Sequence, residues 1–290
     1  MYRAIAANKR NTVLVMMVFV VLITAIGFLV SAFFGDVYIT YWVMAGAALY
    51  AFIQYFLASK LAVAMTGAKQ IEKKDNPRLY RIVENLSITL GMPMPKVYLI
   101  ADPAPNAFAT GRNPKTAVVA ATTGLLDIME DRELEAVMAH EMGHVQNYDI
   151  RVSMIAFGLV SAIGILSDII LRMLFYGGRR DNVHPVVLVI GLVVVVLAPI
   201  IAMIVQFAVS RQREFLADAT GVMTTRDAEG LARALEKLKL HGKPLQSQHS
   251  ATAHLFISNP LRKGFLSGLF STHPPLEQRI ERLRQHGHTF

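Results

Sequence analysis

Two histidines and a glutamate in one short stretch could carry metal chemistry, because residues 140–144 (His-Glu-Met-Gly-His) have the pattern H-E-x-x-H. Residues four apart lie one turn from each other on the same face of an α-helix, so His140 and His144 could chelate one Zn²⁺ without bending the backbone. Glu141 projects near that face, where it could act as general base on a water molecule. The alternative is two surface histidines that flank a charged residue.

The residues before the motif predict the helix that this chemistry needs. Asp131 is a suitable N-cap, and acidic residues follow it in the first turn. Leu134, Val137 and Met138 supply an apolar stripe. This helical context favours a zinc site over surface histidines.

A catalytic zinc site normally has three protein ligands and one open position, so a third ligand is required. Glu214 is our candidate, in an expected helix over 211–222. Asp218 lies four residues later on the same face, where it could accept the outer N–H of a ligating histidine and fix its tautomer. Read alone, these acids beside Arg213 would more often form a solvated, salt-bridged face. The H-E-x-x-H motif shifts the interpretation toward a metal site.

The composition indicates a membrane protein, because 53% of the 290 residues are hydrophobic and only 17% are charged. The chain has no cysteine, which excludes disulfides, thiolate metal sites and a cysteine nucleophile. The formal net charge of +8 is dispersed without an aromatic-interleaved basic stripe. We therefore expect no nucleic-acid partner and a basic face against the anionic lipid bilayer.

Long uncharged stretches predict four transmembrane helices in two hairpins. They divide the chain into an N-terminal hairpin (1–59, with spans 11–35 and 37–59), a first catalytic half (60–151), a second hairpin (152–209) and a second catalytic half (210–290). A signal peptide is the alternative for the first span, but its apolar run is too long and a second one follows at once. Apart from Asp168, the spans offer almost no ionisable residue, which argues against a transporter.

The parts outside these spans have a mixed α and β pattern. We expect helices over 76–90, from the N-cap Asp131 through the H-E-x-x-H motif, and over 211–222, 228–240 and 274–284. Strands are expected over 96–100, 107–110 and 117–121. Lysine and arginine crowd the tail 1–10 and both catalytic halves. By the positive-inside rule these regions are cytoplasmic, so both termini and the active site should face the cytoplasm of a bacterial-type inner membrane.

Several motifs together resemble the HtpX family of membrane-embedded zinc endopeptidases, which is related to the CAAX prenyl endopeptidase. They are the H-E-x-x-H motif, residues 214–218, Thr272-His273-Pro274, and the stretches 106–111 and 147–149. The resemblance implies an α+β membrane protein. It would have four transmembrane helices and a mainly helical, gluzincin-type zinc protease domain with a small β-sheet, split by the second hairpin. It also implies one Zn²⁺ per chain and the clearance of misfolded or damaged membrane proteins under stress, in cooperation with other membrane proteases.

Carried over residue by residue, the resemblance makes His140, His144 and Glu214 the zinc ligands and Glu141 the general base. Asp218 would orient His140, and Asp149 would likewise lie behind the ligands. Further residues have two interpretations each. His273 would stabilise the oxyanion, or be a turn histidine before two prolines. Arg279 would lock the final helix onto the site, or be one of several surface arginines, which the sequence favours.

The strand 107–110 and the residue before it (Asn106, Ala107, Phe108, Ala109 and Thr110) could receive substrate by strand addition, or be an ordinary core strand. Two other functions stay open beside general proteolysis. One is a dedicated processing peptidase of the prenyl-endopeptidase type. The other is a membrane adaptor in which zinc is only structural, although an intact Glu141 argues against it, since a structural site needs no base.

Overall fold

The computed structural model describes residues 2–155, 159, 211–246, 255–258 and 274–286. Contacts divide the chain into two compact units, the first with Met1–Lys9, Ser59–Met154 and Val209–Phe290, and the second with Arg10–Ala58 and Ile155–Ala208. Most of the predicted second hairpin, with Asp168, lies outside the described residues.

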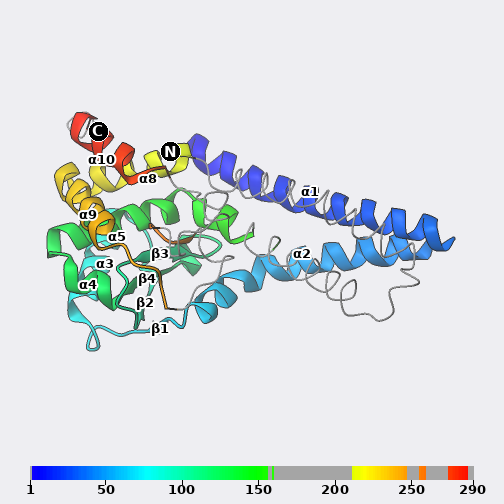
Figure 1. The fold of residues 1–290 in the computed structure, drawn as a ribbon, viewed down its shortest axis with the longest axis horizontal. Helices are drawn as coiled ribbons and strands as arrows, with labels where there is room; N and C mark the ends of the chain where they lie inside the picture. The colour runs from blue at the N-terminus through cyan, green and yellow to red at the C-terminus, as the bar shows by residue number, and fades with distance from the viewer. Residues whose placement is uncertain (1, 156–158, 160–210, 247–254, 259–273, 287–290) are drawn as a thin grey trace, which may run out of the picture. The chain divides into compact units, whose positions relative to one another are not determined.

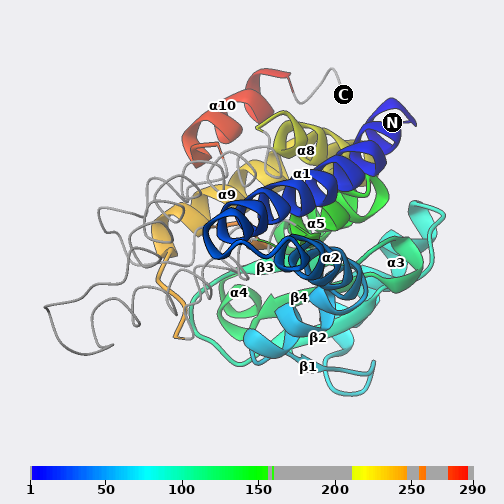
Figure 2. The same ribbon diagram turned by 90° about the vertical axis from the view of Figure 1, so that its right-hand side faces the viewer.

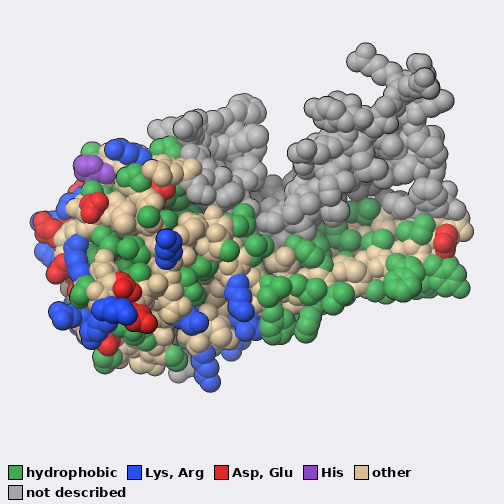
Figure 3. Space-filling view, turned by 90° about the horizontal axis from the view of Figure 1, so that it is seen from below, with side chains coloured by type: hydrophobic (Ala, Val, Ile, Leu, Met, Phe, Trp, Pro, Cys, Tyr) green, Lys and Arg blue, Asp and Glu red, His purple; other side chains and the backbone are tan. Residues whose placement is uncertain are grey.

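Two long apolar helices open the chain, α1 (Tyr2–Phe34) and α2 (Tyr38–Met65). Over Ile5–Phe28 and Tyr38–Met65 they are long and apolar enough to cross a membrane. Large apolar side chains of both helices are exposed, among them Val21, Trp42 and Phe52. Figure 3 shows hydrophobic side chains in green over much of the narrow part of the described surface. The predicted tail 1–10 is helical from Tyr2 onward, because nothing in this alanine-containing stretch interrupts a helix.

A four-stranded sheet has the order β1-β2-β4-β3. Its strands are β1 (Lys69–Gln70), β2 (Lys96–Ile100), β3 (Ala107–Thr110) and β4 (Val118–Thr122). Strand β2 pairs with β4 in parallel, whereas β1 and β3 pair antiparallel with their neighbours. The short helix η1 (Pro114–Thr116) lies between β3 and β4. The three strands expected from the sequence are present, and β1 was not foreseen because its two residues are exposed and too few to show alternation.

Three helices flank the sheet, α3 (Pro77–Thr89), α4 (Thr123–Ile128) and α5 (Asp131–Gln146). Helix α5 begins one residue earlier than expected, since its N-cap is Glu130 and not Asp131. Glu130 and Glu133 form a capping box, in which the Glu133 carboxylate accepts a 2.8 Å hydrogen bond from the Glu130 amide. This reciprocal cap fixes the start of the helix that carries H-E-x-x-H.

Helices α8 (Arg211–Thr225), α9 (Ala228–His241) and α10 (Leu276–His286) follow late in the chain. Figures 1 and 2 agree in placing α5 between the sheet on one side and α8 and α9 on the other, with α10 beyond them. The motif helix is therefore the middle layer of unit 1.

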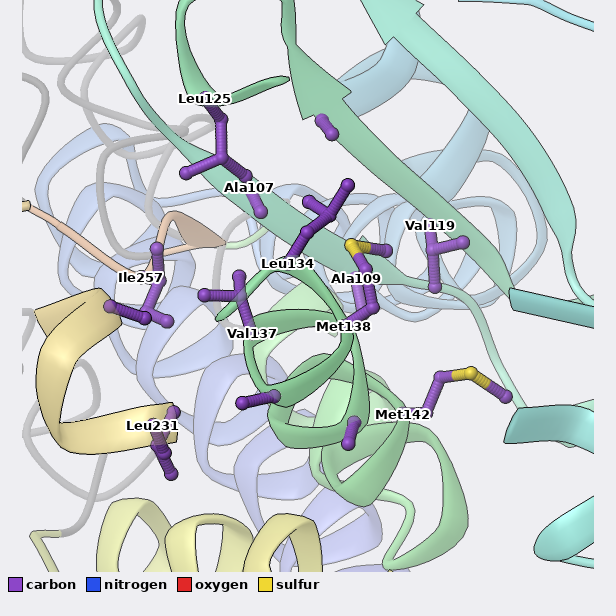
Figure 4. Close-up of a cluster of buried hydrophobic side chains, with 14 of the residues drawn as sticks. Ala107, Ala109, Val119, Leu125, Leu134, Val137, Met138, Met142, Leu231 and Ile257 are labelled. Carbon is purple, nitrogen blue, oxygen red and sulfur yellow. The ribbon is translucent and has the colours of Figure 1, made fainter. Parts of the chain in front are cut away.

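The apolar core surrounds α5 and includes side chains of the sheet and of α9, such as Leu231 (Figure 4). Leu134, Met138 and Met142 are fully buried there, against Ala109 and Val119 of the sheet. At roughly 1.5–3 kcal/mol for each large apolar side chain removed from water, this packing holds α5 firmly in place. The helix can then present its other face, with the histidines, to α8.

Candidate metal centre

Helices α5 and α8 cross closely, and a glycine lies at the crossing in each of them. A Cβ atom on Gly221 would be 3.1 Å from the backbone nitrogen of His140, and one on Gly143 would be 3.2 Å from Cβ of Thr220. Because larger residues would push the helices apart, these glycines allow the short side chain of Glu214 to reach both histidines.

The three predicted ligands converge. His144 Nε2 lies 3.5 Å from Glu214 Oε1, and His140 Nε2 lies 3.8 Å from Glu214 Oε2. One ligand atom from each of the three residues lies within 4.8 Å of the others. His140 and Glu214 are buried, and His144 is the most exposed of the three, with 14% of its side chain accessible.

The outer nitrogen of each histidine faces a carboxylate. His140 Nδ1 lies 2.9 Å from Asp218 Oδ1, and His144 Nδ1 lies 3.1 Å from Asp149 Oδ2. A carboxylate can only accept, so each Nδ1 carries a proton, and Nε2 is the atom of each ring that can bind a metal once it is deprotonated. This is the arrangement that supports a metal-binding histidine from behind.

Arg279 of α10 is fully buried. The interpretation that the sequence favours, a surface arginine, is therefore wrong. Its Nη2 and Nε atoms donate to Asp218 at 2.6 and 2.9 Å, and its Nη1 lies 3.6 Å from Glu214 Oε2. These contacts agree with the other interpretation, in which Arg279 attaches the final helix to the site. No sequence signal indicates which arginine is buried, because α10 carries several arginines of the same kind.

The two histidines titrate differently in the metal-free chain. Burial, reinforced by the Arg279 charge, lowers the pKa of His140 to about 4. Burial also opposes the charged form of His144, but the carboxylates of Glu214, Asp149 and Glu141 outweigh it and raise the pKa to about 9. Burial would raise the pKa of Asp218, yet Arg279 and His140 lower it to about 2, so this carboxylate is ionised.

These donors fit a zinc ion. Two imidazole nitrogens, which bind metal in their neutral form, and one carboxylate form a donor set that catalytic zinc sites use. Glu141, the expected general base, is also buried, and its charge acts on both His144 and Arg279. His273 lies outside the described residues.

Strand β3 does not present an open edge over its whole length. Its side away from β4 pairs with residues 255–258, where Ile257 N donates to Ala107 O at 3.0 Å and Phe108 forms an antiparallel bridge with Phe256. The Asn106 side chain donates to Ser258 O at 2.9 Å and accepts from Ser258 N at 3.2 Å. Ala109 and Thr110 are also buried, so the described structure gives β3 the surroundings of a core strand.

The sequence matches known proteins along its whole length. The sequence model of peptidase family M48 matches residues 73–286. A protease HtpX homolog of Tropheryma whipplei (strain Twist) is 57% identical over 100% of both chains. A homolog of the same name in Streptococcus gordonii is 43% identical over 98% of this chain and 99% of the relative. Another, in Dictyoglomus thermophilum, is 41% identical over 99% of this chain and 95% of the relative.

Among solved structures, Ste24p of S. mikatae aligns with a TM-score of 0.45 and 22% identity, covering 81% of this chain and 58% of that one. Membership rests on the sequence matches, which are long and high in identity. The chain therefore belongs to peptidase family M48 and, within it, to the HtpX proteases.

Proposed function

We propose that this chain is a zinc-dependent endopeptidase that cleaves misfolded or damaged membrane proteins at the cytoplasmic face of a bacterial inner membrane. Membership of its family makes it a membrane metalloprotease. The observation that carries the zinc assignment is the convergence of two histidine Nε2 atoms on the Glu214 carboxylate, with each Nδ1 held by a further carboxylate.

In this proposal His140, His144 and Glu214 hold the ion, which when bound would polarise the scissile carbonyl and the attacking water. Glu141 accepts the proton that this water loses and delivers it to the leaving amine. Its burial beside His144 and Arg279 supports the role, because a carboxylate shielded from bulk water transfers a proton within the site. His273 is proposed to donate to the oxyanion.

The cytoplasmic placement rests on the distribution of positive charge. Lysine and arginine are frequent in residues 60–149 and in the segment after 210, whereas the tip between α1 and α2 has none. A site within about two helical turns of a membrane span would meet the loops and tails of membrane proteins first. We therefore propose four spans, the division of the chain at 59, 151 and 209, and membrane proteins as substrates.

Peptide substrate is proposed to bind in extended form along β3. Because residues 256–258 already pair with Ala107 and Phe108, addition at that end of the strand requires this segment to move. At the Ala109–Thr110 end, β3 pairs with β4, but among the described residues none pairs with its other side.

The decisive experiment compares Glu141→Gln with the wild-type chain in proteoliposomes, using a destabilised membrane protein, a soluble unfolded protein and a prenylated peptide as substrates. Glu141→Gln should retain stoichiometric zinc and lose cleavage by at least about 100-fold, since it removes the general base. Glu135→Gln, half-buried on the same helix, is the matched control and should cleave normally.

Cleavage by Glu141→Gln at the wild-type rate would disprove the base assignment. Activity confined to the prenylated peptide would identify a dedicated processing peptidase. A wild-type chain that retains zinc but cleaves none of the three substrates would favour the structural-zinc adaptor.

A further inference from the structure

The turn that follows α5 holds one of the two carboxylates behind the histidines. It consists of Asn147, Tyr148 and Asp149, and Asp149 Oδ2 lies 3.1 Å from His144 Nδ1. Tyr148 has a φ of +62°, in the left-handed region that residues with a Cβ rarely adopt. Such a conformation persists where surrounding contacts support it. One of them is local, because the Arg151 guanidinium lies 5.0 Å from the centre of the Tyr148 ring.

The first turns of α1 make further contacts with the turn, although they lie far away in the sequence. Asn8 Nδ2 donates to Asn147 O at 2.9 Å and to Asp149 Oδ1 at 2.6 Å. The next residue, Lys9, places its Nζ atom 4.9 Å from the centre of the Tyr148 ring. Thus two successive residues of α1 contact all three residues of the turn, and all five belong to unit 1.

The chemistry of Asn8 fits its two partners. A side-chain amide nitrogen carries two hydrogens, and here it faces two oxygen atoms that can only accept. Asn8 is 4% exposed and Asp149 is 3% exposed, so water hardly competes for either group. The two oxygens of Asp149 are thereby divided, with Oδ1 bound by Asn8 and Oδ2 facing His144.

We propose that Asn8 is a positioning residue of the metal centre, which acts through Asp149 on His144. By binding Oδ1 it fixes the rotation of the carboxylate, so that Oδ2 holds the Nδ1 proton and His144 directs Nε2 toward Glu214. This rests on the proposed function, since it concerns how the proposed ligand is held. It makes the start of the first membrane helix a part of the catalytic centre.

The test measures metal retention in the full-length, detergent-solubilised chain. Asn8→Asp keeps the size of the side chain and replaces the donor with a carboxylate that repels Asp149, and Asn8→Ala removes the donor alone. With zinc bound, both variants should release the ion to a chelator about tenfold faster. Loss of a partner behind a metal ligand weakens metal binding by about 10–100-fold, and we expect an effect near the lower end of that range. The visible spectrum of the Co²⁺-loaded protein should change as well. Arg10→Ala, exposed on the same helix, should do neither.

A double-mutant cycle separates positioning from a general loss of structure. Because Asn8 acts through Asp149, Asn8→Ala should add little to the release rate of Asp149→Ala. Fully additive effects, or release from Asn8→Asp at the wild-type rate, would overturn the inference.

Amide hydrogen exchange in the metal-free chain gives a readout that does not depend on zinc. Residues 148–150 should exchange faster in both Asn8 variants and not in Arg10→Ala, and unchanged exchange would overturn the inference. A wild-type chain that takes up no metal would refute the proposed function instead, and the exchange measurement would still decide whether Asn8 holds the turn.

Discussion

The two histidines of the proposed centre are supported in different ways. Behind His140 lie Asp218 and Arg279, which form a buried ion pair. Behind His144 lie Asp149 and Asn8, a carboxylate and a neutral amide, and the His144 side chain is 14% exposed. One side is held by opposite charges between α8 and α10, and the other by hydrogen bonds between a turn and the start of α1.

This difference predicts that changes on the two sides affect different properties, the stability of the fold on one side and metal binding on the other. A buried ion pair leaves an uncompensated charge when one partner is removed, so the His140 side should tolerate little change. An amide can be lost at the smaller cost of one hydrogen bond. We therefore expect damage on the His140 side to affect the fold, and damage on the His144 side to affect mainly the binding of metal.

The largest effect is expected when the cation on the His140 side is removed. Arg279→Met should destabilise the chain by about 3–5 kcal/mol, because Asp218 and Glu214 are left buried without their positive partner. Denaturant unfolding in detergent would measure it. Gln278→Met, exposed on the same helix, should change stability by less than about 0.5 kcal/mol. If the two variants were equally stable, the ion pair would not be the element that holds this side.

The two supporting carboxylates offer a closer comparison. Asp218→Asn and Asp149→Asn should each weaken zinc binding by about 10–100-fold, since each removes the acceptor behind a ligand. The loss should be greater for Asp218→Asn, which also leaves Arg279 buried with a neutral partner. Competition with a chelating dye would rank them. Greater loss for Asp149→Asn would reverse the order that the burial implies.

The smallest effect concerns the proton that metal must displace. Below a pH of about 9 His144 of the metal-free chain carries a proton, whereas His140 is neutral above about 4. Zinc binding near neutral pH should therefore release about one proton, and the apparent affinity should fall about tenfold for each unit by which pH is lowered below 9. Calorimetry in buffers of different ionisation enthalpy would count this proton. Asp149→Asn should shift the dependence to lower pH, and an unshifted profile would contradict the role of its charge.

The sequence was sufficient where the signal is local or where a known chemistry demands a partner. The strands over 96–100 and 107–110 follow from local pattern, and Glu214 follows from the need of H-E-x-x-H for a third ligand. The N-cap of α5 was placed one residue late, because Glu130 and Asp131 are both acidic and only the geometry of the capping box distinguishes them.

Asn8 and the burial of Arg279 could not be predicted. Asn8 contacts residues about 140 positions away, and nothing in its neighbourhood distinguishes it from other polar residues at the start of a membrane helix. Arg279 is one of several arginines in α10, and only the docking of that helix shows which of them faces Asp218. Both depend on tertiary contacts that leave no period or motif in the chain.

The order in which the parts of this centre occur along the chain has a consequence during synthesis. His140 and His144 leave the ribosome long before Glu214, and Arg279 follows later still. A nascent chain thus carries the H-E-x-x-H helix without the proposed third ligand and without the cation that neutralises Asp218. In the proposed function, peptide-bond cleavage therefore requires α8 to have been translated and docked against α5, which delays proteolysis during synthesis.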